Sequence, residues 1–168
     1  LASAGRIGGT SSGEALQVVA DGGAAVAVKA AAAAGDVRLR VDGQADVEQI
    51  SAGGAGHAVN LLVNGALRQA NTQTGTAITA DVVNLKSTSS GGIGATGQAL
   101  TVQTKELNAA APGDIYLKQA SGDMAVGLIA SDFGNIELSA PSGQVVGVAP
   151  TSSTLTNELA EKIAMWED

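Results

Sequence analysis

The chain contains the stretch Ile7-Gly8-Gly9-Thr10-Ser11-Ser12-Gly13-Glu14-Ala15-Leu16-Gln17-Val18 and, further along, a second version of it, Ile93-Gly94-Ala95-Thr96-Gly97-Gln98-Ala99-Leu100-Thr101-Val102. Each version runs on to a glycine–aspartate step and a β-branched residue, Gly35-Asp36-Val37 in the first and Gly113-Asp114-Ile115 in the second. Stacked copies of one segment bury a core that no copy could bury alone. The sequence therefore predicts a repeat protein over 1–150, with copies at about 5–87 and 88–148.

The composition suits a narrow solenoid interior. Apolar types make up 45% of the 168 residues, but aromatic types only 2%, namely Tyr116, Phe133 and Trp166. Aromatic side chains usually supply much of the area that a globular core buries. The interior must therefore be filled by Val, Ile, Leu and Ala, and the 23 glycines separate the apolar segments.

Short β-rich segments recur between clusters of Gly, Asn, Asp and Ser. We expect strands at 16–19, 25–29, 37–41, 46–50, 58–63, 77–86, 99–103, 115–118, 124–129, 136–139 and 145–148. The spacing of the two copies fits about four coils of roughly twenty residues each, which favours an all-β parallel β-helix. An antiparallel sandwich or barrel is the alternative, but only Asp21-Gly22, Asp42-Gly43 and Asn64-Gly65 are steps typical of tight hairpins.

The sequence of one alanine-rich segment is compatible with either a strand or a helix. The run Ala30–Ala34 is helix-forming by propensity, yet it follows Val26-Ala27-Val28, which alternates like a strand. We expect a strand with an enlarged loop there, and a helix only as the less favoured reading.

The last residues change character. One helical stripe is formed by Leu155, Leu159, Ile163 and Trp166. We therefore expect a short helix within 151–168. It either caps the last coil or begins a following module.

Charge and composition exclude several classes of function. The net charge is −7 and the nine Lys and Arg residues are scattered, which argues against binding to nucleic acid. The chain has no cysteine, so it has no disulfide and no thiolate metal site. No apolar run approaches the ~20 residues that span a bilayer, so we expect no direct membrane insertion. We also expect both ends to continue in a longer protein.

Three motifs that could carry chemistry are weak. Gly92–Gly97 matches the dinucleotide pattern G-x-G-x-x-G, but the strand-like Gln98–Val102 follows it in place of a helix. Gly53–Val59 resembles a calcium-binding nonapeptide, but Ala58 stands where the aspartate ligand belongs. His57 is the only histidine, and zinc sites need more than one such ligand. We expect no cofactor and no metal.

The aspartates are the remaining catalytic candidates, because paired carboxylates hydrolyse polysaccharides. Most of them stand beside glycine, where aspartate favours local bonding to the backbone. The equivalence of Asp36 and Asp114 in the repeat points to a structural role used twice. Few aromatic residues are available to stack on sugar rings, so we expect that the protein is not an enzyme. The candidates are Asp36, Asp42, Asp46, Asp114, Asp123 and Asp132.

A series of short motifs follows in fixed order through the chain. From Asp81 onward they are Asp81-Val82-Val83-Asn84-Leu85, Gly91-Gly92-Ile93-Gly94, Gln98-Ala99-Leu100-Thr101-Val102, Leu107-Asn108-Ala109, Gly113-Asp114-Ile115-Tyr116-Leu117 and Gly134-Asn135-Ile136-Glu137-Leu138. Over about residues 5–148 the series resembles the repeat region of filamentous haemagglutinin-like large exoproteins of Gram-negative bacteria. The resemblance implies a right-handed parallel β-helix in the passenger of a two-partner-secreted or autotransporter-type protein.

By the same resemblance, the expected function is that of a structural stalk segment in a large secreted adhesin. Such a stalk presents distal binding modules at the outer membrane surface for cell adhesion or biofilm attachment. The implied partners are neighbouring repeats of the same or an identical chain, and a host-cell or matrix receptor or a polysaccharide. A self-assembling extracellular filament and a polysaccharide-binding or polysaccharide-active β-helix are the alternatives.

The repeat also predicts which side chains stack inside the solenoid. They are aliphatic residues at corresponding places in the β-rich segments. We expect a stacked core that includes Ile7, Val37, Leu61, Ile93, Ile115, Leu117, Ile136 and Leu138.

Overall fold

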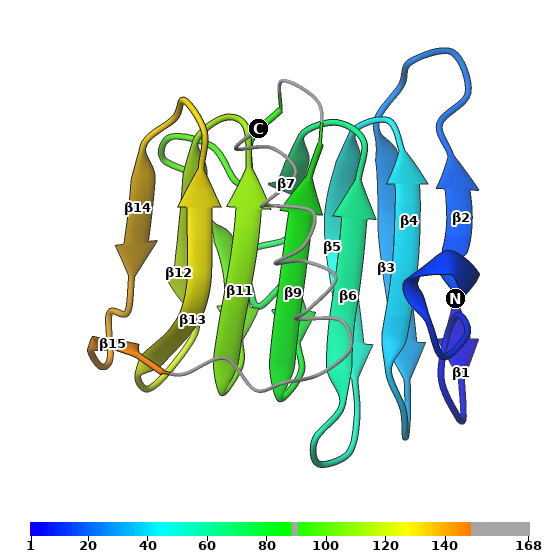
Figure 1. Ribbon diagram of the computed structural model, residues 1–168, viewed down its shortest axis with the longest axis horizontal. Coiled ribbons are helices and arrows are strands. Elements are labelled where there is room, and N and C mark those ends of the chain that lie inside the picture. Colours follow the sequence, from blue (N-terminus) through cyan, green and yellow to red (C-terminus); the bar gives the residue numbers. More distant parts are fainter. Residues whose placement is uncertain (89–90, 149–168) are drawn as a thin grey trace.

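The computed structural model describes residues 1–88 and 91–148, which form a parallel β-solenoid of about six turns (Figure 1). Two sheets face each other across its interior. Sheet A has the strand order β1-β3-β5-β8-β10-β12-β14, with β7 also paired to β5, and sheet B has the order β15-β13-β11-β9-β6-β4-β2. Every pairing between named strands is parallel, so the fold is the all-β parallel β-helix that the repeat predicts.

The strands are short and alternate between the two sheets, except that β7 and β8 both belong to sheet A. Sheet A contains β1 (Ala2–Ser3), β3 (Val26–Ala32), β5 (Ala45–Ala52), β7 (Leu67–Gln69), β8 (Ile78–Thr79), β10 (Leu100–Gln103), β12 (Ile115–Gln119) and β14 (Ile136–Ser139). Sheet B contains β2 (Leu16–Val19), β4 (Val37–Asp42), β6 (Ala58–Val63), β9 (Val82–Ser87), β11 (Glu106–Ala111), β13 (Met124–Ser131) and β15 (Val145–Gly147).

The one helix within the described residues is a 3-10 turn, η1 (Ser12–Glu14). In this part of the chain no helix combines the length and the apolar character needed to cross a membrane. The helix expected within 151–168 lies outside the described residues.

The coil is right-handed. In Figure 1 the strands of sheet B face the viewer and run upward, the chain then passes behind to sheet A, and successive coils advance from right to left. Connections between parallel strands adopt this hand almost always, because the right-handed twist of the strands favours it.

Aliphatic side chains stack in columns through the interior. In sheet B, Leu39 pairs with Leu61, Leu61 with Leu85 and Leu85 with Ala109, so that successive partners are 22, 24 and 24 residues apart. All four side chains are at most 2% exposed. Side chains alternate between the two faces of a strand, so residues that are in register point to the same face. The inward side chain of each coil therefore stacks on the inward side chain of the coil before it. Burial of each leucine contributes about 1.5–3 kcal/mol.

Glycines form a second column where the chain turns from sheet B to sheet A. Gly43, Gly65, Gly91, Gly113 and Gly134 occupy this corner in successive coils. A Cβ added to Gly134 would lie 2.3 Å from the carbonyl carbon of Gly113, and one added to Gly65 would lie 2.5 Å from the carbonyl oxygen of Gly43. The backbones of successive coils approach so closely here that a side chain does not fit.

The two sequence copies lie on opposite sheets. Ile7 bridges to Val37 of β4 in sheet B, whereas Ile93 bridges to Ile115 of β12 in sheet A. The strand after the first motif is β2 of sheet B, and the strand after the second is β10 of sheet A. By strand order the copies are therefore offset by about three and a half coils rather than the four expected, because the motif fits either corner of the flattened coil.

Most of the expected strands are present, with differences that have physical reasons. The expected strand 77–86 is divided into β8 and β9 at Ala80-Asp81, where the chain turns between the sheets. The run at Ala30–Ala34 begins as strand, since β3 continues to Ala32. Strands β1, β7 and β11 were not predicted from the sequence. Strand β11 ends in three alanines, which have low intrinsic preference for strands.

Six of the eight residues expected in the core are buried: Ile7, Val37, Leu61, Ile93, Ile115 and Leu117. The other two, Ile136 and Leu138, belong to β14. Leu138 is half-buried against the core, but Ile136 is 46% exposed, contrary to the expectation. Its strand is the edge of sheet A in the described part of the chain, so β12 covers it on one side only.

Adjacent residues of β12 provide a test of this packing. We expect Leu117→Ala to lower the free energy of unfolding by about 2–5 kcal/mol, because Leu117 is fully buried and the vacated space lies between coils. The neighbouring Lys118→Ala faces solvent and should change stability by less than about 0.5 kcal/mol. Urea unfolding followed by circular dichroism measures both. Equal effects from the two substitutions would contradict the assigned inward and outward faces.

Candidate functional site

Aspartates at the corners of the solenoid bind the backbone of the next coil. Each accepts a hydrogen bond at Oδ1 from an N–H about one coil further on, at a turn where the strand ladder does not supply a partner. The bonds are Asp36 to Ala58 at 2.9 Å, Asp114 to Asn135 at 2.7 Å and Asp123 to Gln144 at 2.9 Å. Asp36 and Asp114 thus share one structural role, as the sequence suggested, but they bond to the backbone of the next coil and not locally as expected.

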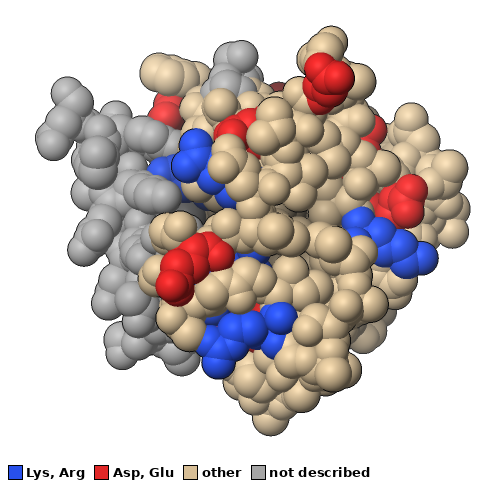
Figure 2. All heavy atoms as spheres, turned by 90° about the vertical axis from the view of Figure 1, so that its right-hand side faces the viewer, with Lys and Arg blue, Asp and Glu red and all other residues tan. Residues whose placement is uncertain are grey.

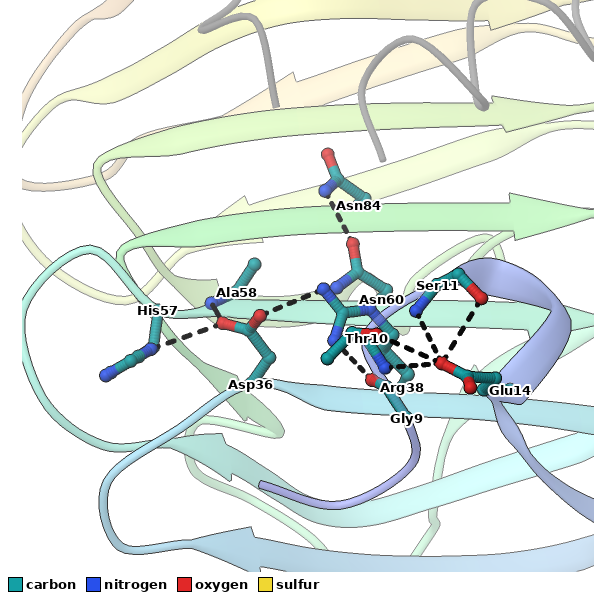
Figure 3. A network of polar contacts seen from close by, with 10 residues as sticks. All are labelled: Gly9, Thr10, Ser11, Glu14, Asp36, Arg38, His57, Ala58, Asn60 and Asn84. Atoms are coloured by element: carbon teal, nitrogen blue, oxygen red, sulfur yellow. Dashed lines mark hydrogen bonds and ion pairs between the residues drawn. The ribbon is translucent and has the colours of Figure 1, made fainter. Parts of the chain in front are cut away.

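In the first copy the aspartate belongs to a larger polar network (Figure 3). The Arg38 guanidinium lies 3.0 Å from Oδ2 of Asp36 and also donates to the carbonyl of Gly9 at 2.6 Å. Nδ1 of His57 lies 3.3 Å from Oδ1 of Asp36. Both carboxylate oxygens are thus engaged by groups from its own and the next coil. Arg38 adds a link to the preceding one, so the network holds three coils together.

A second carboxylate in the same view closes the loop before β2. Oε2 of Glu14 accepts hydrogen bonds from the backbone N–H groups of Thr10 at 2.8 Å and Ser11 at 3.2 Å, and from both hydroxyls (Figure 3). The backbone N–H of Thr10, followed by its hydroxyl, holds the pKa of Glu14 below its ordinary value. The carboxylate therefore shapes the loop whose Gly9 carbonyl meets Arg38.

The second copy keeps the backbone of this corner and changes its chemistry. A Cβ on Gly8 would lie 2.6 Å from the carbonyl oxygen of Arg38, and one on Gly94 would lie 2.3 Å from that of Tyr116. Tyr116 therefore takes the place of Arg38. The Thr96 hydroxyl donates to the Tyr116 hydroxyl at 3.1 Å, where the first copy has an ionic network.

A depression of about 480 Å³ opens beside this second corner. Tyr116 and Phe133, the two aromatic residues of the described part, both line it, and Phe133 is 93% exposed. Arg68 and Asp114 add a cation and a carboxylate to the lining. Within residues 1–88 and 91–148 the Arg68 guanidinium makes no hydrogen bond or ion pair. Aromatic rings beside polar and charged groups are the side chains that contact sugars and other polar small molecules.

A column of asparagines runs across sheet B. Asn84 donates to Asn60 at 2.7 Å, and Asn108 donates to Asn84 at 2.9 Å. Oδ1 of Asn108 then accepts the Leu128 N–H at 2.8 Å, where β13 bulges. This column was not predicted above, although the sequence contains a signal for it, because apolar-Asn-apolar triplets recur 24 residues apart.

Asp81 was also missed, and it connects three coils. Its side chain accepts the N–H of Gly56 at 2.8 Å from the preceding coil and lies 3.0 Å from Lys105 Nζ of the following one. The Gly56 N–H and then the Lys105 hydrogen bond hold the pKa of Asp81 below its ordinary value. Asp81 stands between Ala80 and Val82 and lacks the adjacent glycine that marks Asp36 and Asp114 in the sequence.

The structure does not bring the candidate carboxylates together. Asp42 contacts Arg40 and Gln17, Asp46 accepts from Gln44, and Asp132 is exposed. Among the residues that the structure describes, no three His, Asp or Glu side chains converge as metal ligands. The glycine-rich stretch Gly92–Gly97 leads to β10, a strand.

Comparisons with protein-family models, with curated proteins and with solved structures find no match to this chain. The geometry of the solenoid and its corners is therefore the basis for proposing a function. The resemblance to haemagglutinin-like exoproteins rests on the sequence motifs alone.

Asp81 gives the fold a pH dependence that can be measured. A carboxyl group whose pKa is lowered by folding stabilises the protein above its unfolded pKa, about 3.9, and this contribution disappears as the pH falls through the lower folded value. We therefore expect Asp81→Asn to be less stable than the parent at pH 7. The two proteins should converge at acid pH, once the pH has fallen below the lowered pKa of Asp81 in the folded state.

Urea unfolding at pH 7, 5 and 3 measures the difference between parent and variant. The control is Asp132→Asn, because Asp132 is exposed. A difference for Asp81→Asn that stays constant over the whole pH range would show that the charge of Asp81 does not stabilise the fold.

Proposed function

We propose that the chain is a structural stalk segment of a large secreted bacterial surface adhesin. Its work is mechanical, and it holds distal binding modules away from the cell for surface adhesion or biofilm attachment. The proposed site of action is the outer membrane surface of a Gram-negative bacterium. The proposal includes no catalytic step, no cofactor and no contact with nucleic acid.

The observation that carries the proposal is the character of the two end coils. At the N-terminal end Leu16 is 39% exposed although it is in register with the buried Leu39. At the C-terminal end Ile136 and Val145 are each 46% exposed, and Ile136 is in register with the buried Ile115. Each end thus presents the open side of a core column. A further coil of the same kind would bury these side chains, as stacked repeats require.

The charge distribution at the N-terminal end agrees with continued stacking. Figure 2 views this end of the rod, and most of the face is uncharged, with basic and acidic side chains in small separate groups. The net charge of −7 keeps rods apart from one another and limits non-specific association. Coil stacking at the ends and repulsion along the sides are both properties that a stalk needs.

Immunogold electron microscopy on intact cells that produce the full-length protein tests the proposal. Antibodies raised against this chain should label structures that stand off the outer membrane, whereas an antibody to a cytoplasmic protein of the same cells should not label. Label for this chain that appears only after the cells are sectioned, and only in the cytoplasm, would overturn the adhesin proposal.

The depression beside Tyr116 favours a second candidate function, binding of a polysaccharide. On this alternative we expect Phe133→Ala and Arg68→Ala each to abolish glycan binding, because both side chains line the depression and neither contributes to the buried core. A glycan array probed with the parent chain and the two variants measures this. Lys118→Ala is the control, since Lys118 is exposed on the strand that holds Tyr116. An array that the parent chain does not bind would exclude the alternative.

The open end coils also fit a filament in which copies of the chain stack end to end. Sedimentation velocity at rising concentration tests this alternative. We expect an association that Ile136→Glu abolishes, because a carboxylate at the end coil cannot be buried without a partner. A parent chain that stays monomeric at all concentrations contradicts the filament and leaves the stalk proposal intact.

A further inference from the structure

The depression beside Tyr116 lies where one coil lacks outward side chains on the side of sheet A. Leu67, Ile93 and Ile115 form one inward column, since Leu67 and Ile115 each bridge to Ile93 and all three are fully buried. The residue that follows each of them points outward. In successive coils these outward residues are Arg68, Gly94 and Tyr116. The coil of Gly94 therefore leaves a gap between an arginine on one side and a tyrosine on the other.

The floor of the depression is fixed by backbone packing. Gly92 and Gly94 occupy both outward positions of this coil, and both line the depression. A Cβ on Gly92 would lie 2.3 Å from the carbonyl oxygen of Asp114, and one on Gly94 would lie 2.3 Å from that of Tyr116. Neither position admits a side chain, because the next coil lies directly against it. The first copy has Arg6 in place of Gly92, so the two copies differ in this feature.

The charged groups that line the depression have opposite signs and atoms without partners. Arg68 is exposed, and its guanidinium makes no hydrogen bond or ion pair in the described part of the chain. Asp114 uses Oδ1 for the backbone N–H of Asn135, while its Oδ2 has no partner among the same residues. Arg68 and Asp114 belong to the coils before and after that of Gly94, so their backbones are about 9–10 Å apart along the rod. Donor groups thus come from one wall and an acceptor oxygen from the other.

This arrangement of charges selects the class of ligand. An anion would gain from Arg68 but would meet the carboxylate of Asp114, and a second carboxylate, that of Asp46, is in register with Arg68 on the coil before. A cation would meet the guanidinium of Arg68. A neutral molecule with hydroxyls on opposite edges can accept hydrogen bonds from Arg68 and donate one to Asp114, without repulsion from either. A neutral sugar ring has this distribution of hydroxyls.

We propose that the depression binds one neutral pyranose unit of a glycan, with hydroxyls bonded to the Arg68 guanidinium and to Oδ2 of Asp114. The C–H groups of the sugar pack against Tyr116 and Phe133, whose rings line the same depression. The gap is a single coil wide, which limits the site to one ring. This inference rests on the glycan-binding candidate above and adds the charge and size of the ligand. The stalk proposal does not depend on it.

Saturation-transfer difference NMR of the full chain, titrated with single methyl glycosides, measures the selectivity. The neutral probes are the methyl glycosides of glucose, galactose and mannose, and the acidic probes are those of glucuronic and galacturonic acid. We expect at least one neutral probe to bind. Its uronic acid counterpart should bind at least about tenfold more weakly, because the added carboxylate meets Asp114 and a hydrogen bond to a charged group is lost.

Asp114→Asn tests the role of the carboxylate, since asparagine keeps an oxygen for the Asn135 N–H and loses the negative charge. We expect this variant to bind the neutral probe about tenfold more weakly and to lose the discrimination against the uronic acid. The matched control is Asp123→Asn, because Asp123 makes the same kind of bond to Gln144 and does not line the depression. It should leave both affinities unchanged. Far-ultraviolet circular dichroism verifies that both variants keep the sheets.

The outcomes separate this inference from the candidate function on which it rests. A parent chain that binds the uronic acids as tightly as the neutral probes, or more tightly, overturns the inference and leaves glycan binding intact. A parent chain that binds none of the probes contradicts both. Displacement of the neutral probe by free alanine, a zwitterion, would show that the site selects paired charges and would also overturn the inference. The same result would follow from an equal loss of binding in Asp123→Asn and Asp114→Asn, since the effect would then come from the corners in general.

Discussion

The backbone hydrogen bonds between successive coils fix a register on which the rest of this structure depends. Leu39, Leu61 and Leu85 stack because the ladder places them opposite one another. The same register aligns the asparagine column one residue away on the outer side. A slip of one residue would turn the leucines to the outside and the asparagines to the inside. Packing, polar columns and corner contacts are therefore consequences of a single pairing scheme.

The corners show how strictly this scheme constrains the sequence. Coils that are stacked at strand distance bring the turn backbones together, and only glycine fits at positions such as Gly65 and Gly134. The free N–H groups beside these turns must also be paired, and Asp36 and Asp114 supply the acceptors. Coil stacking thus accounts for the repeated glycine–aspartate step in the sequence.

What the sequence predicted was the part of the fold that repeats. The β-rich segments, the parallel solenoid and the buried Val37, Ile115 and Leu117 follow from periodicity and composition. The exposure of Ile136 was not predictable, because burial at this position depends on which strand is last in the sheet. Strand β11 was not predictable, because packing overrides the low strand preference of alanine. The depression was beyond prediction, because its side chains come from different coils and meet only after the chain has wound up.

The opposite placement of the two copies bears on how such a chain grows. The first motif lies at one corner of the flattened coil and the second at the other. In both, a glycine (Gly8 or Gly94) lies close to a backbone carbonyl of the next coil. The same segment thus fits on either side of the coil. A duplication that inserts an odd number of strands still winds into the same rod. The fold can therefore lengthen during evolution in steps of about 11–12 residues, half a coil at a time.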